Sequence, residues 1–225
     1  MSLVAVLVEA LILASSGLIS VGSILIVILL LISERGLKNG IGYVAGYIFG
    51  YSLISTGMIL LQQRTANQGG SSSNMTFNYI SIFFGLVLLY LAFKNFRKQP
   101  DLEKKEDPKL FRILDGITPV KAFSLGLVVT ILNFKNLALF LTSISVVAFS
   151  GLSISEKIFA AVLVIIVFTI SVMTPVFIYL LFPTRGREIL ETIRDALKRH
   201  SRPISIWGPL IFGVILLFRG GMAIL

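Results

Sequence analysis

The chain contains no cysteine, which excludes disulfide bonds, thiolate metal sites and cysteine nucleophiles. Its single histidine, His200, stands among basic residues in a polar stretch, a setting typical of a solvated surface rather than of a metal site. Carboxylates are almost absent from the apolar runs, where Glu9 is the only one. We therefore expect no metal and no cofactor, and divalent-metal transport is disfavoured for lack of ligands.

Charge of either sign is scarce, and apolar residues take its place. Charged residues make up 14% of the 225 residues and hydrophobic residues 56%, with a mean hydropathy of +0.92. A bilayer crossing needs roughly 20 apolar residues. The sequence therefore predicts an all-α integral membrane protein, a single transmembrane domain over residues 1–225, with the first apolar run kept as a span rather than cleaved. Six runs are long enough: 3–32, 40–61, about 75–93, 122–152, 158–182 and 204 to the C-terminus.

The basic residues are distributed unevenly between the loops. Most of the 20 Lys and Arg residues follow the first, third and fifth runs, and few lie in the other loops. Because basic residues collect in cytoplasmic loops, we expect a multi-pass protein of the cytoplasmic (plasma) membrane with both termini outward. No basic domain exists to bind nucleic acid. The outward loop at 62–78 is nearly uncharged and contains a glycosylation sequon at Asn74.

Six spans divide into two sets of three, residues 1–93 and 122–225, joined by a cytoplasmic linker at 94–121. If the sets are related, the odd number makes the second inverted relative to the first, as in many transporters. The first and fourth runs are both unusually long, and each has a polar interruption near its middle, at 15–23 ("SSGLISVGS") and at 132–136 ("LNFKN"). Paired interruptions predict two helices that open at the midplane and line a binding site.

The second interruption contains a lysine, Lys135, between Asn133 and Asn136. A charge near the bilayer centre costs at least about 2.5 kcal/mol, so it needs a wet cavity, a counter-ion or a ligand. The two amides and the free N–H groups of an opened helix favour an anion beside it. The alternative is that backbone carbonyls or a buried carboxylate hold Lys135 for structural reasons. The predicted site includes, as its facing wall, Ser20, Gly22 and Ser23.

Other features of the runs point to packing more than to binding. Glu9 either pairs with Arg219 near the outward interface or couples transport to a proton gradient. Pro175 is expected to kink the fifth span and is a candidate hinge. A stripe of glycines at four-residue spacing predicts close helix contact, within one bundle or in a homodimer: Gly42, Gly46 and Gly50. Three tyrosines share this spacing and either pack or line a cavity: Tyr43, Tyr47 and Tyr51.

Two segments carry a family resemblance, "LISVGSILIVILLLISERGLKNGIGYVAGYIFG" in the first half and "ILNFKNLALFL" in the second. The chain resembles, over nearly its whole length, the Sap/GAP family of glycolipid- and peptidolipid-addressing proteins within the lysine-exporter (LysE-type) superfamily. Family members have S-P-x-P where this chain has Ser20 to Ser23, and N-P-K-N where it has Asn133 to Asn136. The asparagines and the lysine match, and the prolines do not. The resemblance implies a 3+3 inverted-repeat protein that exports, flips or delivers a lipid-like substrate.

The sequence thus favours a transporter that exports or flips an anionic or zwitterionic, lipid-linked substrate, with membrane lipids around it. One alternative is an exporter of amino acids or other small solutes; another is a scaffold for lipid export that transports nothing itself. An enzyme is disfavoured, because no serine with a base, carboxylate pair or metal cluster lies at depth. A lipid site should open sideways to the bilayer, whereas a solute site should open only to water.

Overall fold

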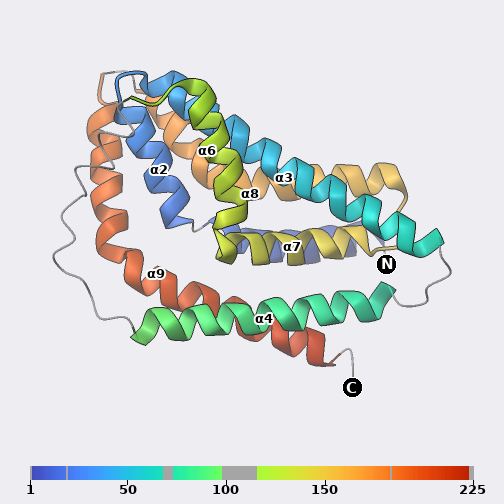
Figure 1. The fold of residues 1–225 in the computed structure, drawn as a ribbon. Helices are drawn as coiled ribbons and strands as arrows, with labels where there is room; N and C mark the ends of the chain where they lie inside the picture. Colours follow the sequence, from blue (N-terminus) through green and yellow to red (C-terminus); the bar gives the residue numbers. More distant parts are fainter. Residues whose placement is uncertain (1, 19, 68–72, 98–115, 183, 223–225) are drawn as a thin grey trace.

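The computed structural model describes residues 2–18, 20–67, 73–97, 116–182 and 184–222, and in these residues the fold is all-α. Figure 1 shows helices that surround a central broken pair, with α4 and the last part of α9 forming a separate layer beneath them. The elements are, in order, α1 (Leu3–Ser15), η1 (Ser16–Leu18), α2 (Val21–Ile32), α3 (Gly36–Asn67), α4 (Ser73–Arg97), α6 (Pro119–Leu132), α7 (Phe134–Ala148), α8 (Ile154–Leu181) and α9 (Gly186–Met222).

Two described helices are long and apolar enough to cross a membrane, α3 over Gly36–Arg64 and α8. The pair α6 and α7 counts as a third crossing if the bent pair is one span. Shorter apolar helices are α1, α2 and residues Ile206–Phe218 of α9. The first residues of α1 and the last of α9 lie towards the same side of the molecule in Figure 1. The membrane character of the chain is supported, and the six-crossing arrangement stays a prediction.

Both predicted interruptions are present. The first run is divided into α1, the short helix η1 and α2, and the fourth is divided at Asn133 into α6 and α7, which meet at an angle of 75°. The residues at the breaks have similar non-helical backbone angles: φ is −102° and ψ 73° at Ser20, and φ is −81° and ψ 75° at Asn133. A ψ near +75° lies outside the helical range, so the helix axis changes direction at each break.

Close contact between α3 and α6 holds the second broken helix in place. A Cβ built on Gly46 would collide with the Phe123 backbone carbonyl, and one on Gly42 would lie 2.6 Å from the Pro119 oxygen. A Cβ on Gly50 would lie 2.5 Å from the Thr130 hydroxyl. The glycine stripe therefore lies against α6, where two helix backbones touch and leave no room for side chains.

Helix α9 is continuous from Gly186 to Met222, although Pro203 and Pro209 lie within it. Its first part packs on the bundle through Leu190, which is fully buried, and its last part runs beside α4 (Figure 1). There the helices approach at Gly85 and Gly213, where a Cβ on either would lie 3.1 Å from the other's carbonyl oxygen. The predicted sixth span is thus the last part of a longer helix. Pro175 likewise lies inside an unbroken α8, so its hinge role stays a prediction.

The buried Lys157 ties three helices together at the start of α8. Its Nζ donates to the Ala148 carbonyl at the end of α7 (2.8 Å) and to Gln62 Oε1 of α3 (3.0 Å).

Hydrogen bonds to charged groups contribute about 1.5–3 kcal/mol. Lys157→Met should therefore lower the unfolding midpoint of the detergent-solubilised protein by several degrees in a thermal melt. Lys121→Met, which removes an exposed lysine, should leave the midpoint unchanged, and equal melting of both variants would contradict this role.

A cavity between the two helix breaks

The two breaks meet in space although 113 residues separate them. Asn133 Nδ2 donates to Ser20 Oγ over 3.3 Å. Asn133 also ends α6 and begins α7: its backbone N–H donates to the Val129 carbonyl, and its side-chain oxygen accepts from the Asn136 N–H at 3.4 Å. An asparagine can do both because, at the N-cap, its side-chain oxygen takes the place of a carbonyl of the missing preceding turn. One side chain thus caps a helix and connects the halves of the chain.

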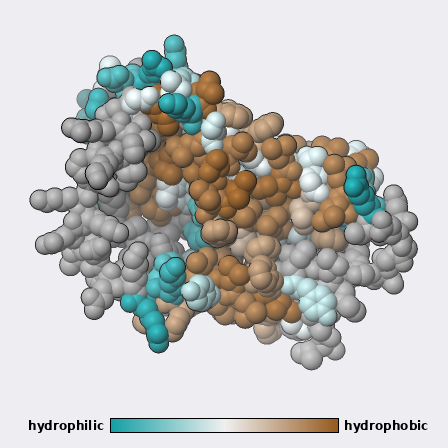
Figure 2. Space-filling model, in the orientation of Figure 1, coloured by the Kyte–Doolittle hydropathy of each residue, from teal (hydrophilic) through white to brown (hydrophobic). Residues whose placement is uncertain are grey.

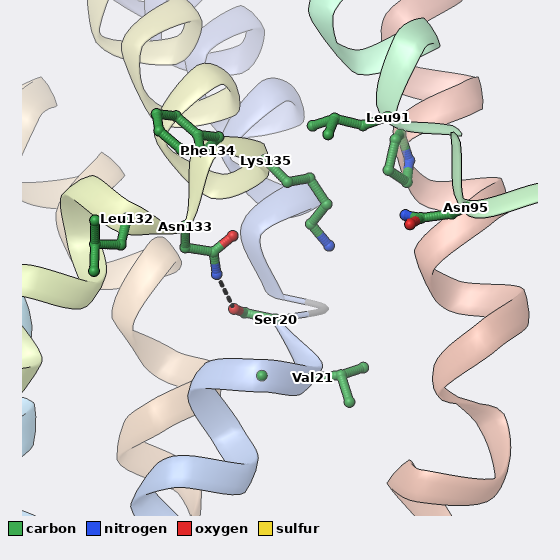
Figure 3. A pocket seen from close by; sticks show the side chains of 10 residues that line it. Ser20, Val21, Leu91, Asn95, Leu132, Asn133, Phe134 and Lys135 are labelled. Carbon is green, nitrogen blue, oxygen red and sulfur yellow. Dashed lines mark hydrogen bonds between the residues drawn. The ribbon is translucent and has the colours of Figure 1, made fainter. Parts of the chain in front are cut away.

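Lys135 extends from the first turn of α7 into a cavity of about 400 Å³ beside this contact. In Figure 3 its amine lies between Asn133 and Ser20 on one side and Leu91 and Asn95 of α4 on the other. It is the only charged side chain among the residues that line the cavity in the described part of the chain. The lining residues are Ser20, Val21, Gly22, Leu91, Asn95, Leu132, Asn133, Phe134, Lys135 and Pro209.

Two helices begin at the cavity wall. Val21 and Gly22 open α2, and Phe134 and Lys135 open α7, and all four line the cavity. A helix N-terminus carries roughly half a positive charge, and its first N–H groups have no partner within the helix. Together with the lysine, the two helix starts make the cavity electropositive. The arrangement suits a carboxylate, a phosphate or a sulfate group.

The rim of the cavity is apolar. Leu132 and Phe134, on either side of the break, are each 63% exposed, although both are large hydrophobic residues. Figure 2 shows apolar side chains across the middle of one face, with hydrophilic residues towards its upper end and at the lower left. A charged group inside an apolar rim fits a ligand that is polar at one end and apolar at the other.

Behind the cavity a chain of buried hydrogen bonds joins α2, α3 and α7. Ser20 Oγ donates to Ser23 Oγ (2.9 Å), and Tyr47 of α3 donates to Ser23 Oγ (3.4 Å). The same tyrosine hydroxyl accepts from Asn136 Nδ2 (3.3 Å) and from the Tyr51 hydroxyl (3.4 Å). Tyr47 therefore connects the helix after the first break to the helix after the second. This chain fixes the relative position of the two helix starts.

The structure places the predicted site residues in two groups. Ser20, Gly22, Asn133 and Lys135 line the cavity. The fully buried Asn136 and the 1% exposed Ser23 lie behind it, in the hydrogen-bond chain.

The coupling candidate Glu9 lies elsewhere in the fold. It is half-buried on α1, which packs against α7 and α8, and it is not among the lining residues. The side chains of Arg219, its proposed partner, and of Asn74, the sequon residue, lie outside the described part of the chain.

Three lining residues lie outside both predicted interruptions: Leu91 and Asn95 of α4 and Pro209 of α9. No local signal marks them, because they reach the cavity only through the packing of α4 and α9 against the bundle. Asn95 stands within a basic segment at the end of the third apolar run and looks like a solvated loop residue. For Tyr47 a signal existed, since its four-residue spacing from two other tyrosines put it in a stripe predicted to pack or to line a cavity.

Tyr47→Phe should weaken the connection between the two breaks. Removing the hydroxyl takes away the bonds that it makes with the buried Asn136 amide and the Tyr51 hydroxyl, and one of the two bonds of Ser23 Oγ, at a cost of about 1–3 kcal/mol. We expect a lower thermal midpoint in detergent. Tyr90→Phe, at a 64% exposed position on α4, is the matched control and should melt like the wild type. A Tyr47→Phe midpoint equal to that of the wild type would mean that the hydroxyl adds nothing to the fold.

Comparison with known proteins identifies a family. A family model described as "Sap, sulfolipid-1-addressing protein" matches residues 10–222. No curated protein and no solved structure matches the chain. The matched residues include both breaks, the lysine and every helix that lines the cavity.

Proposed function

This chain belongs to the Sap, sulfolipid-1-addressing protein, family, and we propose that it moves an anionic, lipid-linked molecule across the membrane through the cavity at Lys135. The family description points to work on a lipid. The observation that carries the proposal is the position of the Lys135 amine, inside a cavity where two helices begin and behind an apolar rim. The amine and the helix starts hold the anionic headgroup, and the apolar rim accommodates the lipid chains.

The proposed architecture has six crossings arranged as two inverted sets of three, in the cytoplasmic membrane, with both termini outward. Three features support it. Each half begins with a broken helix, α1 with α2 and α6 with α7. The contacts between halves are reciprocal, since α2 packs on α8 and α9 while α7 packs on α3 and α4. The basic residues lie mainly on the side predicted to be cytoplasmic.

The protein acts in this proposal as a carrier and not as an enzyme. The headgroup leaves water for a site where the lysine charge and the helix starts replace its hydration, while the chains stay in contact with the bilayer. The wall facing the breaks is made of α4 and α9, a layer that contacts α2, α3, α7 and α8 of the bundle. Movement of this layer would expose the headgroup first to one side of the membrane and then to the other. Glu9, on α1, is the proposed coupling group for such a cycle.

Closing the apolar rim tests a lipid substrate against a small solute. The chain has no cysteine, so a Leu91→Cys/Leu132→Cys pair can be bridged by a bis-maleimide without background reaction. In vesicles, the bridged protein should no longer carry fluorescent phosphatidylglycerol between leaflets, while either single variant, treated identically, should remain active. Unchanged lipid movement after complete bridging would reject access from the bilayer. Glutamate efflux blocked by the bridge, with no lipid movement in any variant, would favour a solute exporter.

A further inference from the structure

Two further cavities lie along the seam between α3 and α8. The first cavity, of about 490 Å³, is at the start of α3 and is lined by Glu34, Arg35, Gly36, Leu37, Lys38, Pro119 and Tyr179. The second, of about 220 Å³, is lined by apolar residues only: Ile41, Val44, Ala45, Ile48, Met173, Val176 and Phe177. Neither shares a residue with the Lys135 cavity.

The two cavities follow one another along the seam. Lys38 and Ile41 are one turn apart on α3, and Tyr179 and Val176 are one turn apart on α8. From Arg35 to Ile48 the seam is roughly 20 Å long at 1.5 Å per residue. One leaflet of hydrocarbon is about 15 Å thick. The seam thus has the length of a headgroup followed by a chain within one leaflet.

In the 490 Å³ cavity, the positive charges are placed so that both could contact one bound anion. Arg35 and Lys38 are exposed and stand three residues apart at the start of α3, so they lie on one side of the helix. No acidic residue lies in the first turn of α3 or of α6, where the helix dipole favours negative charge and disfavours lysine and arginine. Cations at a helix start oppose the dipole. A bound phosphate would offset the unfavourable interaction of Arg35 and of Lys38 with the helix dipole.

We propose that the seam between α3 and α8 is a binding site for an anionic membrane phospholipid, separate from the transport cavity. The phosphate lies between Arg35 and Lys38, and an acyl chain runs along Ile41, Ala45 and Ile48. A guanidinium and an ammonium are the groups that proteins use for phosphate. Glu34, at the edge of the same cavity, opposes a second negative charge and limits the affinity.

Native mass spectrometry of the delipidated full-length protein, titrated with dioleoylphosphatidylglycerol or dioleoylphosphatidylcholine, tests the site. Arg35→Gln/Lys38→Gln should weaken phosphatidylglycerol binding by about tenfold or more, since each basic residue near the membrane surface contributes about 1 kcal/mol. Glu34→Gln should strengthen it. Ala45→Trp, which fills the apolar cavity, should weaken it without any change in charge.

Two further measurements distinguish the seam from the Lys135 cavity and from a site for free phosphate. Lys135→Met should bind phosphatidylglycerol at the seam as the wild type does, so failure of the transport proposal leaves this result unaffected. Glycerol phosphate, the headgroup without chains, should compete poorly; equal competition would identify a free-phosphate site and overturn the proposal. Wild-type binding by Arg35→Gln/Lys38→Gln, or equal affinity for phosphatidylcholine, would also overturn it.

Discussion

Lys135→Met is expected to slow the movement of an anionic lipid between leaflets by roughly tenfold to hundredfold. Methionine fills nearly the same space as lysine, so the cavity keeps its shape and loses its one charged side chain among the described lining residues. An ionic hydrogen bond contributes about 1.5–3 kcal/mol, which corresponds to roughly a tenfold to hundredfold loss. The measurement is the transfer rate of fluorescent phosphatidylglycerol in vesicles that contain the purified protein.

Two variants distinguish loss of the charge from general damage. Lys135→Arg keeps the charge but changes its position and should retain part of the activity. Lys121→Met removes an exposed lysine that does not line the cavity and should retain all of it. A Lys135→Met protein that is as active as Lys121→Met would show that the lysine is structural or serves another purpose.

Gly46→Ala is expected to have the largest effect on folding of any single added methyl group on α3. The new Cβ would overlap the Phe123 carbonyl and would also lie 2.7 Å from its carbon and 3.0 Å from its Cα. These are backbone atoms of α6 and cannot turn away, so the helices must separate. Overpacking costs typically about 1–3 kcal/mol, and backbone contact places this case at the upper end. The readout is the thermal midpoint and the yield of monodisperse protein.

Gly57→Ala is the matched control, because it makes the same change on the same helix. A Cβ at Gly57 meets no atom within 4 Å. Alanine stabilises a helix interior by about 0.5–1 kcal/mol relative to glycine, so this variant should melt slightly higher than the wild type. If Gly46→Ala melts like Gly57→Ala, the contact between α3 and α6 is not close, and the position assigned to the second break is wrong.

The breaks could be predicted from sequence because their cause is local. Serine and glycine at 15–23 and asparagine at 132–136 are poor residues for a helix interior, the lysine charge is costly at the bilayer centre, and both helices open there. The prolines typical of family members are absent, yet α6 and α7 still meet at 75°. At Asn133 the side chain caps the start of α7, so a new helix begins there without a proline.

The rest of the site depends on contacts between distant segments, and these contacts cannot be predicted from local patterns in one sequence. Gly22 and Ser23 are adjacent, but the start of α2 turns one into the cavity and buries the other. Asn95 and Pro209 become lining residues only because α4 and α9 form a layer beneath the breaks. Pro203 and Pro209 suggest helix boundaries, but α9 runs without interruption from Gly186 to Met222.

Native mass spectrometry of gently extracted protein, wild type beside Lys135→Met, tests most directly whether the cavity holds an anionic lipid-linked molecule. The account predicts an anionic lipid that the wild type retains and the variant loses, with any lipid bound through Arg35 and Lys38 retained by both. The same lipids in the same numbers on the two proteins would contradict the central claim, because the charge at the break would then hold no lipid.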